Sequence, residues 1–257
     1  MKSGAIILKT PSEIAVMREA NLIVAEILAR IGEMVRPGVT TGELDKLAEK
    51  LIRAAGAKAA FKGYRMRNQK PYPASICSSV NEEVVHGIPG NRVLKEGDVV
   101  GVDVGVIHKG YVGDAARTYP IGKISEQAEK LLTVTRESLY KGIQQCVAGN
   151  RLYDVSGAIQ EHVEANGFSV VRDFVGHGVG RSMHEAPQIP NYKGTGWNPR
   201  LQVGMALALE PMVNEGTWRV KLMPDEWTVI TADGKLSAHF EHSVAITDNG
   251  VLILSEP

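Results

Sequence analysis

The chain has 257 residues with 29 basic and 29 acidic side chains, so its formal net charge is zero when histidine is neutral. Hydrophobic residues make up 44% of the sequence, which excludes a disordered chain of low hydrophobicity and high net charge. The balanced charge argues against a protein that holds nucleic acid by electrostatics. The length is sufficient for one large domain with a full core.

Two cysteines, Cys77 and Cys146, are present, and a protein of this size does not need a disulfide. The N-terminal apolar run covers only residues 5–8, which is too short for the core of a signal peptide. No stretch approaches the ~18 apolar residues that a membrane-spanning helix needs. The sequence therefore predicts a cytoplasmic protein with reduced thiols and no membrane contact.

Helix-start signals occur twice near the N-terminus. Residues 10–13 (Thr-Pro-Ser-Glu) and 40–43 (Thr-Thr-Gly-Glu) each form a capping box, and apolar residues at helical spacing follow both. Pro37-Gly38 ends the first pattern. We therefore expect two helices before the first strand.

Three later segments, residues 98–106, 205–213 and 239–246, have the apolar, β-branched composition of strands. Helical patterns over residues 125–147 and 154–165 separate the first strand from the others. The order of helix pair, strands, helix pair and strands predicts an α+β chain with two similar halves.

Four carboxylates lie in or beside glycine-rich or apolar strands: Asp103, Asp114, Glu210 and Glu241. Each one alone is explained at least as well by a salt bridge or a solvent-facing position. If the two halves face each other across a pseudo-twofold axis, the four acids gather in one place. Such a cluster needs compensating positive charge, which divalent metal ions supply densely.

His177 lies between two glycines that permit a close approach of the backbone. One imidazole with four carboxylates suits two ions such as Mn, Fe(II) or Co better than a structural Zn site. Two such ions activate a bridging water and polarise a carbonyl group. The residues thus indicate metal-assisted hydrolysis.

Five ordered segments resemble the motifs of type I methionine aminopeptidases. They are residues 81–89 (NEEVVHGIP), 102–105 with 113–116 (VDVG and GDAA), 174–192 (FVGHGVGRSMHEAPQIPNY), 209–212 (LEPM) and 240–242 (FEH). The resemblance extends from about residue 8 to residue 254. It implies the pita-bread fold, in which two pseudo-twofold-related halves surround a central antiparallel sheet. We expect a single catalytic domain over residues 1–257.

The resemblance also assigns metal ligands. Asp103 would bind one metal with both oxygens, Asp114 and Glu241 would bridge two metals, and His177 and Glu210 would complete the other site. The expected cofactor is a pair of divalent ions, Co, Mn or Fe(II), with Zn and Ni as further candidates.

Two histidines that are not ligands receive catalytic roles from the same resemblance. His184 would stabilise the tetrahedral intermediate, His86 would contact the scissile amide and help the leaving nitrogen, and Glu210 would take the proton of the attacking water. Taken singly, each histidine is as readily an ordinary turn residue. His242 should face the side of its strand opposite Glu241. The histidines without motif context are interpreted as surface or structural residues: His108, His162 and His239.

The substrate pocket is a further implication of the resemblance, which places five residues around a methionine side chain in addition to His86 and His184: Tyr64, Tyr72, Cys77, Met183 and Trp227. Aromatic and sulfur-containing walls suit a thioether, although the two tyrosines and the tryptophan are equally explained by plain packing. Phe61 replaces a frequent Cys, Met183 replaces a frequent aromatic residue, and the loop at residues 65–71 is longer than in many relatives. Cys77 has no base assigned to it and is expected to pack near the pocket, and Cys146 is expected in the core.

The expected substrates are peptides and nascent chains that begin with methionine and continue with a small second residue. The resemblance further implies a monomer with transient ribosome contact and no specific nucleic-acid ligand. A peptidase of the same fold that cleaves Xaa-Pro bonds is one alternative, but those relatives usually carry an extra N-terminal domain, whereas the first ligand here is already residue 103. The gap between His177 and Glu210 leaves little room for the helical insertion of type II relatives. A non-catalytic peptide-binding module is the other alternative, and it would be expected to lose ligands.

Overall fold

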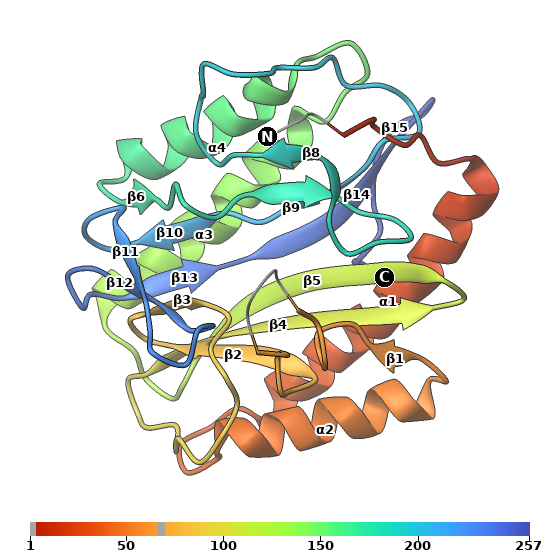
Figure 1. The fold of residues 1–257 in the computed structure, drawn as a ribbon. Helices are drawn as coiled ribbons and strands as arrows, with labels where there is room; N and C mark the ends of the chain where they lie inside the picture. Colours follow the sequence, from red (N-terminus) through yellow and green to blue (C-terminus); the bar gives the residue numbers. More distant parts are fainter. Residues whose placement is uncertain (1–3, 66–69) are drawn as a thin grey trace.

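The computed structural model describes residues 4–65 and 70–257, and Figure 1 shows their fold. The helices of this part of the chain are α1 (Pro11–Met34), α2 (Thr41–Ala54), α3 (Glu126–Gln144) and α4 (Leu152–Ala165). Thr10 and Glu13 form the predicted capping box of α1, and Thr40 and Glu43 form that of α2. None of the helices in residues 4–65 and 70–257 is long and apolar enough to cross a membrane.

One antiparallel sheet of nine strands forms the centre of the molecule. Seven strands follow the order β1 (Lys58–Ala59), β4 (Val99–His108), β5 (Tyr111–Pro120), β14 (Glu241–Thr247), β9 (Ala206–Leu209), β7 (Gly176–Gly178) and β8 (Glu185–Ile189). The strand β2 (Ile76–Val80) pairs with β4, and β15 (Gly250–Ile253) pairs with β14.

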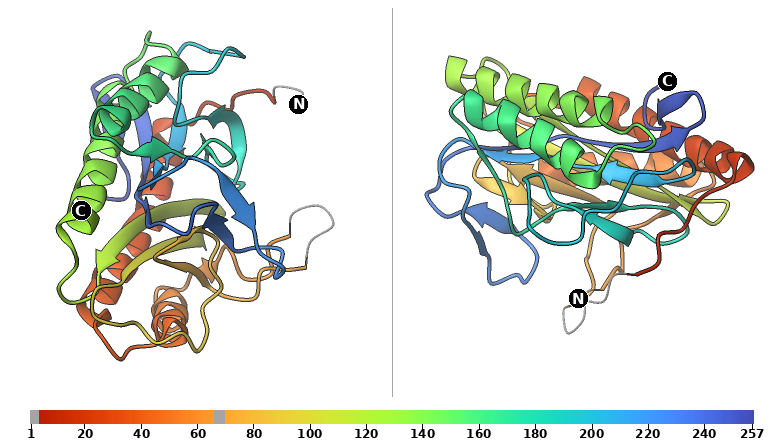
Figure 2. Two further views of the ribbon diagram at one scale, coloured as in Figure 1. Left: turned by 90° about the vertical axis from the view of Figure 1, so that its left-hand side faces the viewer. Right: turned by 90° about the horizontal axis from the view of Figure 1, so that it is seen from above.

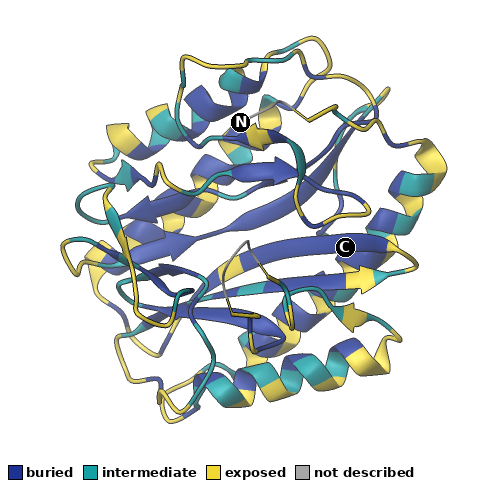
Figure 3. Ribbon diagram, in the orientation of Figure 1, coloured by how far each residue is buried: buried dark blue, intermediate teal, exposed yellow. Residues whose placement is uncertain are grey.

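Two three-stranded sheets complete the fold. One has the order β13 (Ser237–His239), β10 (Met212–Asn214) and β6 (Ser169–Val170), and the other β11 (Val220–Leu222), β12 (Val229–Thr231) and β3 (Glu83–Val85). Figure 3 shows that the central strands are largely buried, whereas the helices expose their outer sides.

The expected division into halves is visible in the packing. Helix α1 lies on β4 and β5 with α2 beside it, and α3 lies on β9 and β14 with α4 beside it (Figure 2). Each half has its own apolar core: Leu44, Ile76 and Val102 belong to the first, and Leu139 and Leu207 to the second. The halves join where β5 pairs with β14, and this seam crosses the middle of the sheet.

Two predicted strands are each interrupted once. Residues 205–213 divide after Leu209 into β9 and β10, and residues 239–246 divide at Phe240 into β13 and β14. Pro211 lacks the N–H that a continuous ladder needs, and the Phe240 amide donates to the Pro211 carbonyl at 3.4 Å. Both segments of the chain therefore pass from one sheet to another next to a predicted ligand, the first beside Glu210 and the second beside Glu241.

Candidate metal centre and active site

Strand register places three predicted ligands on one face of the central sheet. Asp103 in β4 and Glu241 in β14 both pair with Ala116 in β5. Asp114 precedes Ala116 by two residues, so its side chain points to the same face. The small side chain of Ala116 therefore separates two carboxylates that enter from either side.

The remaining two ligands reach the same face from the other half. His177 in β7 pairs with Ala208 in β9, and Glu210 follows Ala208 by two residues. Ala208 also pairs with Ser243, which is two residues from Glu241. The alternation of side chains along these strands thus directs His177, Glu210 and Glu241 to one side.

All five predicted ligands line one cavity of about 370 Å³. His177 Nε2 lies 3.4 Å from Glu210 Oε1 and 3.8 Å from Asp114 Oδ2. One ligand atom each of Asp114, His177 and Glu241 lie within 4.8 Å of one another. These distances allow the side chains to share bound ions.

The electrostatics of the cluster fit divalent cations. Asp103 Oδ1, Asp114 Oδ1 and Glu241 Oε1 are buried and have no hydrogen-bond partner among the described residues. Burial raises the pKa of Asp103 to about 7. Burial, followed by repulsion from the neighbouring carboxylates, raises the pKa values of Asp114, Glu210 and Glu241 well above the usual range. Carboxylates crowded in this way need positive charge to remain ionised, and the residues present supply oxygen ligands for metal ions.

His177 has the orientation that a metal ligand requires. Its Nδ1 lies 3.0 Å from the Gly178 carbonyl oxygen, which only accepts, so Nδ1 carries the proton. Burial, with a smaller contribution from His184, lowers the pKa of His177 to about 3. The neutral ring therefore turns the lone pair of Nε2 toward the carboxylates.

Close helix packing fixes the backbone of Asp114. A Cβ on the preceding Gly113 would lie 2.5 Å from the Ala20 carbonyl carbon, so only glycine allows α1 to approach here. The side chain of buried Asn21 accepts from the Asp114 amide at 3.1 Å. The Ser243 hydroxyl donates to the Asp114 carbonyl at 2.8 Å. The backbone N–H and the backbone carbonyl of Asp114 are therefore both held by hydrogen bonds to buried side chains.

His86 reaches the cavity from a strained turn. Its φ of 59° lies in the left-handed region, which a non-glycine residue adopts only when its surroundings enforce it. The Tyr72 hydroxyl holds this turn by donating to the Gly87 carbonyl at 2.8 Å. The His86 ring meets Phe174 and Trp227 edge-on, with centroids 5.5 and 6.2 Å away. Burial lowers the pKa of His86 to about 4, which keeps the ring neutral.

His184 lies at the exposed mouth of the cavity. Its ring centroid is 4.5 Å from that of His177. The Tyr64 hydroxyl lies 2.8 Å from His184 Nδ1. If Tyr64 donates this hydrogen bond, the His184 Nε2 carries a proton and points a donor at the cavity.

The predicted pocket residues line the same cavity as the ligands: Tyr64, Tyr72, Cys77, Met183 and Trp227. The Tyr72 and Trp227 rings meet edge-on at 5.2 Å. Cys77 pairs with Asp103 across the strands, and burial raises the pKa of its thiol well above the usual range. A protonated, buried thiol agrees with the expected packing role. Residues 66–69 of the loop at 65–71 lie outside the described part of the chain.

Of the two interpretations of His239, surface or structural, the surface one is wrong. His239 is buried and lines the cavity, and its Nε2 lies 3.8 Å from Glu210 Oε2 without a hydrogen-bond partner among the described residues. His239 precedes Glu241 by two residues, and strand alternation could have placed both on one face. Further residues that line the cavity and were not expected there are Val85, Asp173, Phe174, Val175, Gln188 and Met212.

The other histidines and Cys146 agree with their interpretations. His108 and His162 pair with Glu19 and Glu137 at the surface. His242 lines a second cavity, which does not contain the other four predicted ligands, as expected for a side chain on the opposite face of the strand from Glu241. Cys146 belongs to the second apolar core.

A group of carboxylates and an imidazole at the base of a cavity is typical of metallohydrolases, which is the class of protein that the fold and the site indicate. Comparison with known proteins identifies the family. A family model described as metallopeptidase family M24 matches residues 15–248. A methionine aminopeptidase of Clostridium perfringens is 55% identical over 97% of this chain and 98% of its own length. The chain therefore belongs to family M24 and, within it, to the bacterial methionine aminopeptidases, which makes it an aminopeptidase of the hydrolase class.

Solved structures confirm the fold. The methionine aminopeptidase of Thermotoga maritima superposes with a TM-score of 0.94 at 49% identity and covers 98% of this chain and 100% of its own. An Xaa-Pro dipeptidase of Bacillus anthracis has a TM-score of 0.76 at 24% identity. This chain spans only 62% of that dipeptidase, so the second likeness shows the pita-bread fold alone.

Proposed function

We propose that this chain is a metal-dependent aminopeptidase that removes the N-terminal methionine of peptides and nascent proteins. The observation that carries the proposal is the set of four carboxylates and one neutral imidazole on the floor of a cavity with aromatic and sulfur-containing walls. Family membership supports the same reaction. We further propose that residues 1–257 form a single catalytic domain.

Five side chains would hold two divalent ions, Co, Mn or Fe(II), with Zn and Ni as alternatives: Asp103, Asp114, His177, Glu210 and Glu241. When bound, the ions would lower the pKa of a bound water and polarise the substrate carbonyl. The unpartnered oxygens of Asp103, Asp114 and Glu241 support this ligand set, since each needs a cation or a donor.

The residues around the ligands would move protons and stabilise charge. Glu210 would accept the proton of the attacking water and return it to the leaving amine. His184 would donate from Nε2 to the developing oxyanion, which the Tyr64 hydroxyl supports through Nδ1. His86 would hold the scissile amide, because its strained turn aims a neutral ring into the cavity.

Substrate selection would follow from the walls of the cavity. Phe61, Tyr72, Cys77 and Trp227 form or pack against one apolar cluster, which suits a flexible thioether side chain. The cavity of about 370 Å³ must hold the methionine side chain together with the second residue. A small second residue is therefore expected to be preferred.

The setting in the cell is a further part of the proposal. We place the enzyme in the cytoplasm as a monomer that contacts the ribosome transiently, because its substrates would be nascent chains. The non-catalytic alternative is disfavoured by the complete ligand set in one cavity. The Xaa-Pro alternative is disfavoured because its relatives share only the fold at this level of identity.

The direct test is release of methionine from Met-Ala-Ser with Mn, Fe(II) or Co under anaerobic conditions. We expect turnover by the metal-loaded protein and its loss in Asp103→Ala, with an unchanged circular dichroism spectrum. Met-Trp-Ser should be cleaved more slowly than Met-Ala-Ser. A peptide that begins with Xaa-Pro, in which Xaa is not methionine, should be left intact. No turnover with any of the three metals, or faster cleavage of the Xaa-Pro peptide, would contradict the proposed reaction.

A further inference from the structure

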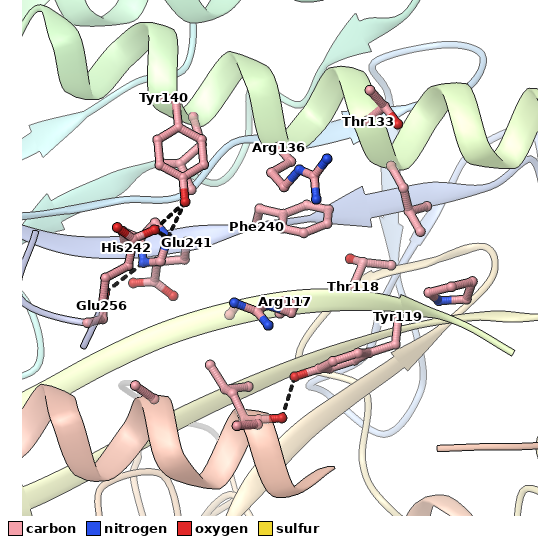
Figure 4. A pocket seen from close by; sticks show the side chains of 18 of the residues that line it. Arg117, Thr118, Tyr119, Thr133, Arg136, Tyr140, Phe240, Glu241, His242 and Glu256 are labelled. Carbon is pink, nitrogen blue, oxygen red and sulfur yellow. Dashed lines mark hydrogen bonds and ion pairs between the residues drawn. The ribbon is translucent and has the colours of Figure 1, made fainter. Parts of the chain in front are cut away.

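A second cavity, of about 750 Å³, lies on the helix-covered face of the central sheet. We call it the rear cavity, and Figure 4 shows part of its lining. Its floor is the seam between β5 and β14, and its walls are α1 and α3, which cover the two halves but leave the seam between them. Side chains alternate between the two faces of the sheet, so the neighbours of Ala116 and Glu241 point to the rear cavity: Arg117, Phe240 and His242. One sheet layer therefore separates the rear cavity from the active site.

Two arginines enter the rear cavity from different elements. Arg117 comes from β5 on the floor and Arg136 from α3 on the wall (Figure 4). Burial raises the pKa of Tyr140 to about 12, and the charges of both arginines oppose that rise. Both arginines thus line the same cavity and lie near the Tyr140 hydroxyl, which also donates to Glu256.

Among the described residues, the side chains of Arg117 and Arg136 form no ion pair and no hydrogen bond. The cross-strand neighbour of Arg117 is Val102, which carries no charge. Residues one helical turn from Arg136 are equally uncharged: Leu132, Thr133, Leu139 and Tyr140. Local sequence thus supplies nothing to neutralise either cation.

The acids that line the rear cavity do not change this balance. Glu256 is engaged at one end, where the Tyr140 hydroxyl donates to it and His242 Nε2 lies 3.3 Å away. Glu129 is exposed on α3, two turns before Arg136, and makes no ion pair with it. Glu241 lines the rear cavity too, but its carboxylate belongs to the metal cluster on the other face. The described acids of the rear cavity therefore lie near the two guanidinium groups without forming an ion pair with either, and both groups remain available to an added anion.

We propose that the rear cavity binds a small organic anion, namely a phosphate monoester on an apolar or aromatic body. Two guanidinium groups match the geometry and the double charge of a phosphoryl group. Phe240 and Tyr119 are buried at the floor and supply aromatic surface for the organic part. The volume falls within the range of roughly 300–1,000 Å³ that is typical of small-molecule pockets.

Titration calorimetry of the metal-loaded protein with phenyl phosphate tests the proposal. We expect binding that weakens at least ~10-fold in Arg117→Gln/Arg136→Gln, because charge-assisted bonds to both guanidinium groups are lost. Arg136→Lys keeps the charge without the planar fork and should give an intermediate affinity. The matched control is Arg30→Gln/Arg53→Gln, which removes the same charge from exposed pairs on α1 and α2 and should leave the affinity unchanged.

Two further arms separate other sources of binding. Inorganic phosphate should bind more weakly than phenyl phosphate, and equal affinities would overturn the organic part of the proposal. Binding that is unchanged in the rear-cavity double variant, or equally weakened in the control, would overturn the site itself. Such binding would belong to the metal centre or to net charge alone. Both arginines are exposed, and an unchanged melting temperature verifies that the variants fold.

Discussion

Lys9 and Glu185 form a nearly buried ion pair, with Nζ and Oε2 2.5 Å apart and side-chain exposures of 4% and 8%. The other oxygen of Glu185 accepts from the amides of Arg181 at 2.9 Å and Ser182 at 3.3 Å. The pair therefore ties the segment before α1 to the turn that leads into His184. The Lys9–Glu185 pair thus holds the turn next to His184, which lies at the mouth of the active cavity.

Replacing Lys9 by Met should lower kcat/KM for Met-Ala-Ser by ~10- to 100-fold, the scale of a misplaced catalytic group. It should also cost about 3–5 kcal/mol of unfolding free energy, because one buried charge loses its partner. Lys193→Met breaks an exposed pair with Glu161 and should cost less than about 1 kcal/mol with normal turnover. Lower stability with wild-type kcat and KM would show that the Lys9 pair has no positioning role.

Gly105→Ala should narrow the proposed methionine pocket. An added Cβ would lie 2.7 Å from Phe61 Cε1 and 2.9 Å from Met183 Cε, so both side chains must shift. We expect ~10-fold lower kcat/KM for Met-Ala-Ser, in line with the effect of one methylene group in an apolar pocket. The overpacking should cost about 1–3 kcal/mol. Steady-state kinetics and denaturant unfolding measure the two effects.

Gly101→Ala is the matched control for that substitution. It lies in the same strand and on the same face, but its added Cβ would meet nothing nearer than Thr118 Oγ1 at 3.4 Å. Turnover should therefore stay close to wild type. Gly105→Ala combined with Phe61→Leu should recover part of the lost kcat/KM. If both single alanine variants lose activity equally, the pocket explanation fails.

The first two helices were predictable because local chemistry determines them. Both capping boxes and the apolar spacing of α1 and α2 depend on residues a few positions apart, and the structure has them as expected. The expected pseudo-twofold relation of the halves and the motifs predicted that Asp103, Asp114 and Glu241 lie close together, and strand register brings them together in the fold.

Features that depend on contacts distant in sequence could not be predicted. Pro211 marks the point where residues 205–213 divide, but the donor to its carbonyl, the Phe240 amide, is distant in sequence. The bounds of β5 were not predicted, since Gly113 and Arg117 weaken its strand pattern. His239 is a different case, because its spacing of two residues from Glu241 is a local pattern that places both on one face of a strand.

Tyr64→Phe should test the orientation of His184. The Tyr64 hydroxyl lies 2.8 Å from His184 Nδ1, and its loss frees the imidazole to exchange its tautomer. We expect kcat to fall ~10-fold, about the effect of one hydrogen bond in the transition state, with little change in KM because the ring remains. Tyr140→Phe removes a hydroxyl that bonds Glu256 in the rear cavity and serves as the control. A raised KM with normal kcat would assign Tyr64 to substrate packing instead.

The cluster of four carboxylates also predicts that removing one of them has opposite effects on stability with and without metal. Asp103, Asp114, Glu210 and Glu241 crowd negative charge on one face of the sheet, and burial and mutual repulsion raise the pKa values of the last three. In metal-free protein this repulsion opposes folding, whereas a bound ion that needs all the ligands favours it. The effect of a single ligand substitution on stability should therefore change sign when metal is added.

Asp103→Asn should stabilise the metal-free protein by about 0.5–2 kcal/mol, the usual gain when a site kept for function is relieved of strain. With saturating Mn the order should reverse, because the wild type gains binding free energy that the variant loses with a carboxylate ligand. Thermal unfolding in chelator and in Mn measures both states of both proteins. The matched control is Asp225→Asn, whose carboxylate bonds Thr228 outside the cluster and which should respond to Mn as the wild type does. If Asp103→Asn is less stable than the wild type in chelator, the carboxylate has a structural partner and the cluster is not held together by metal alone.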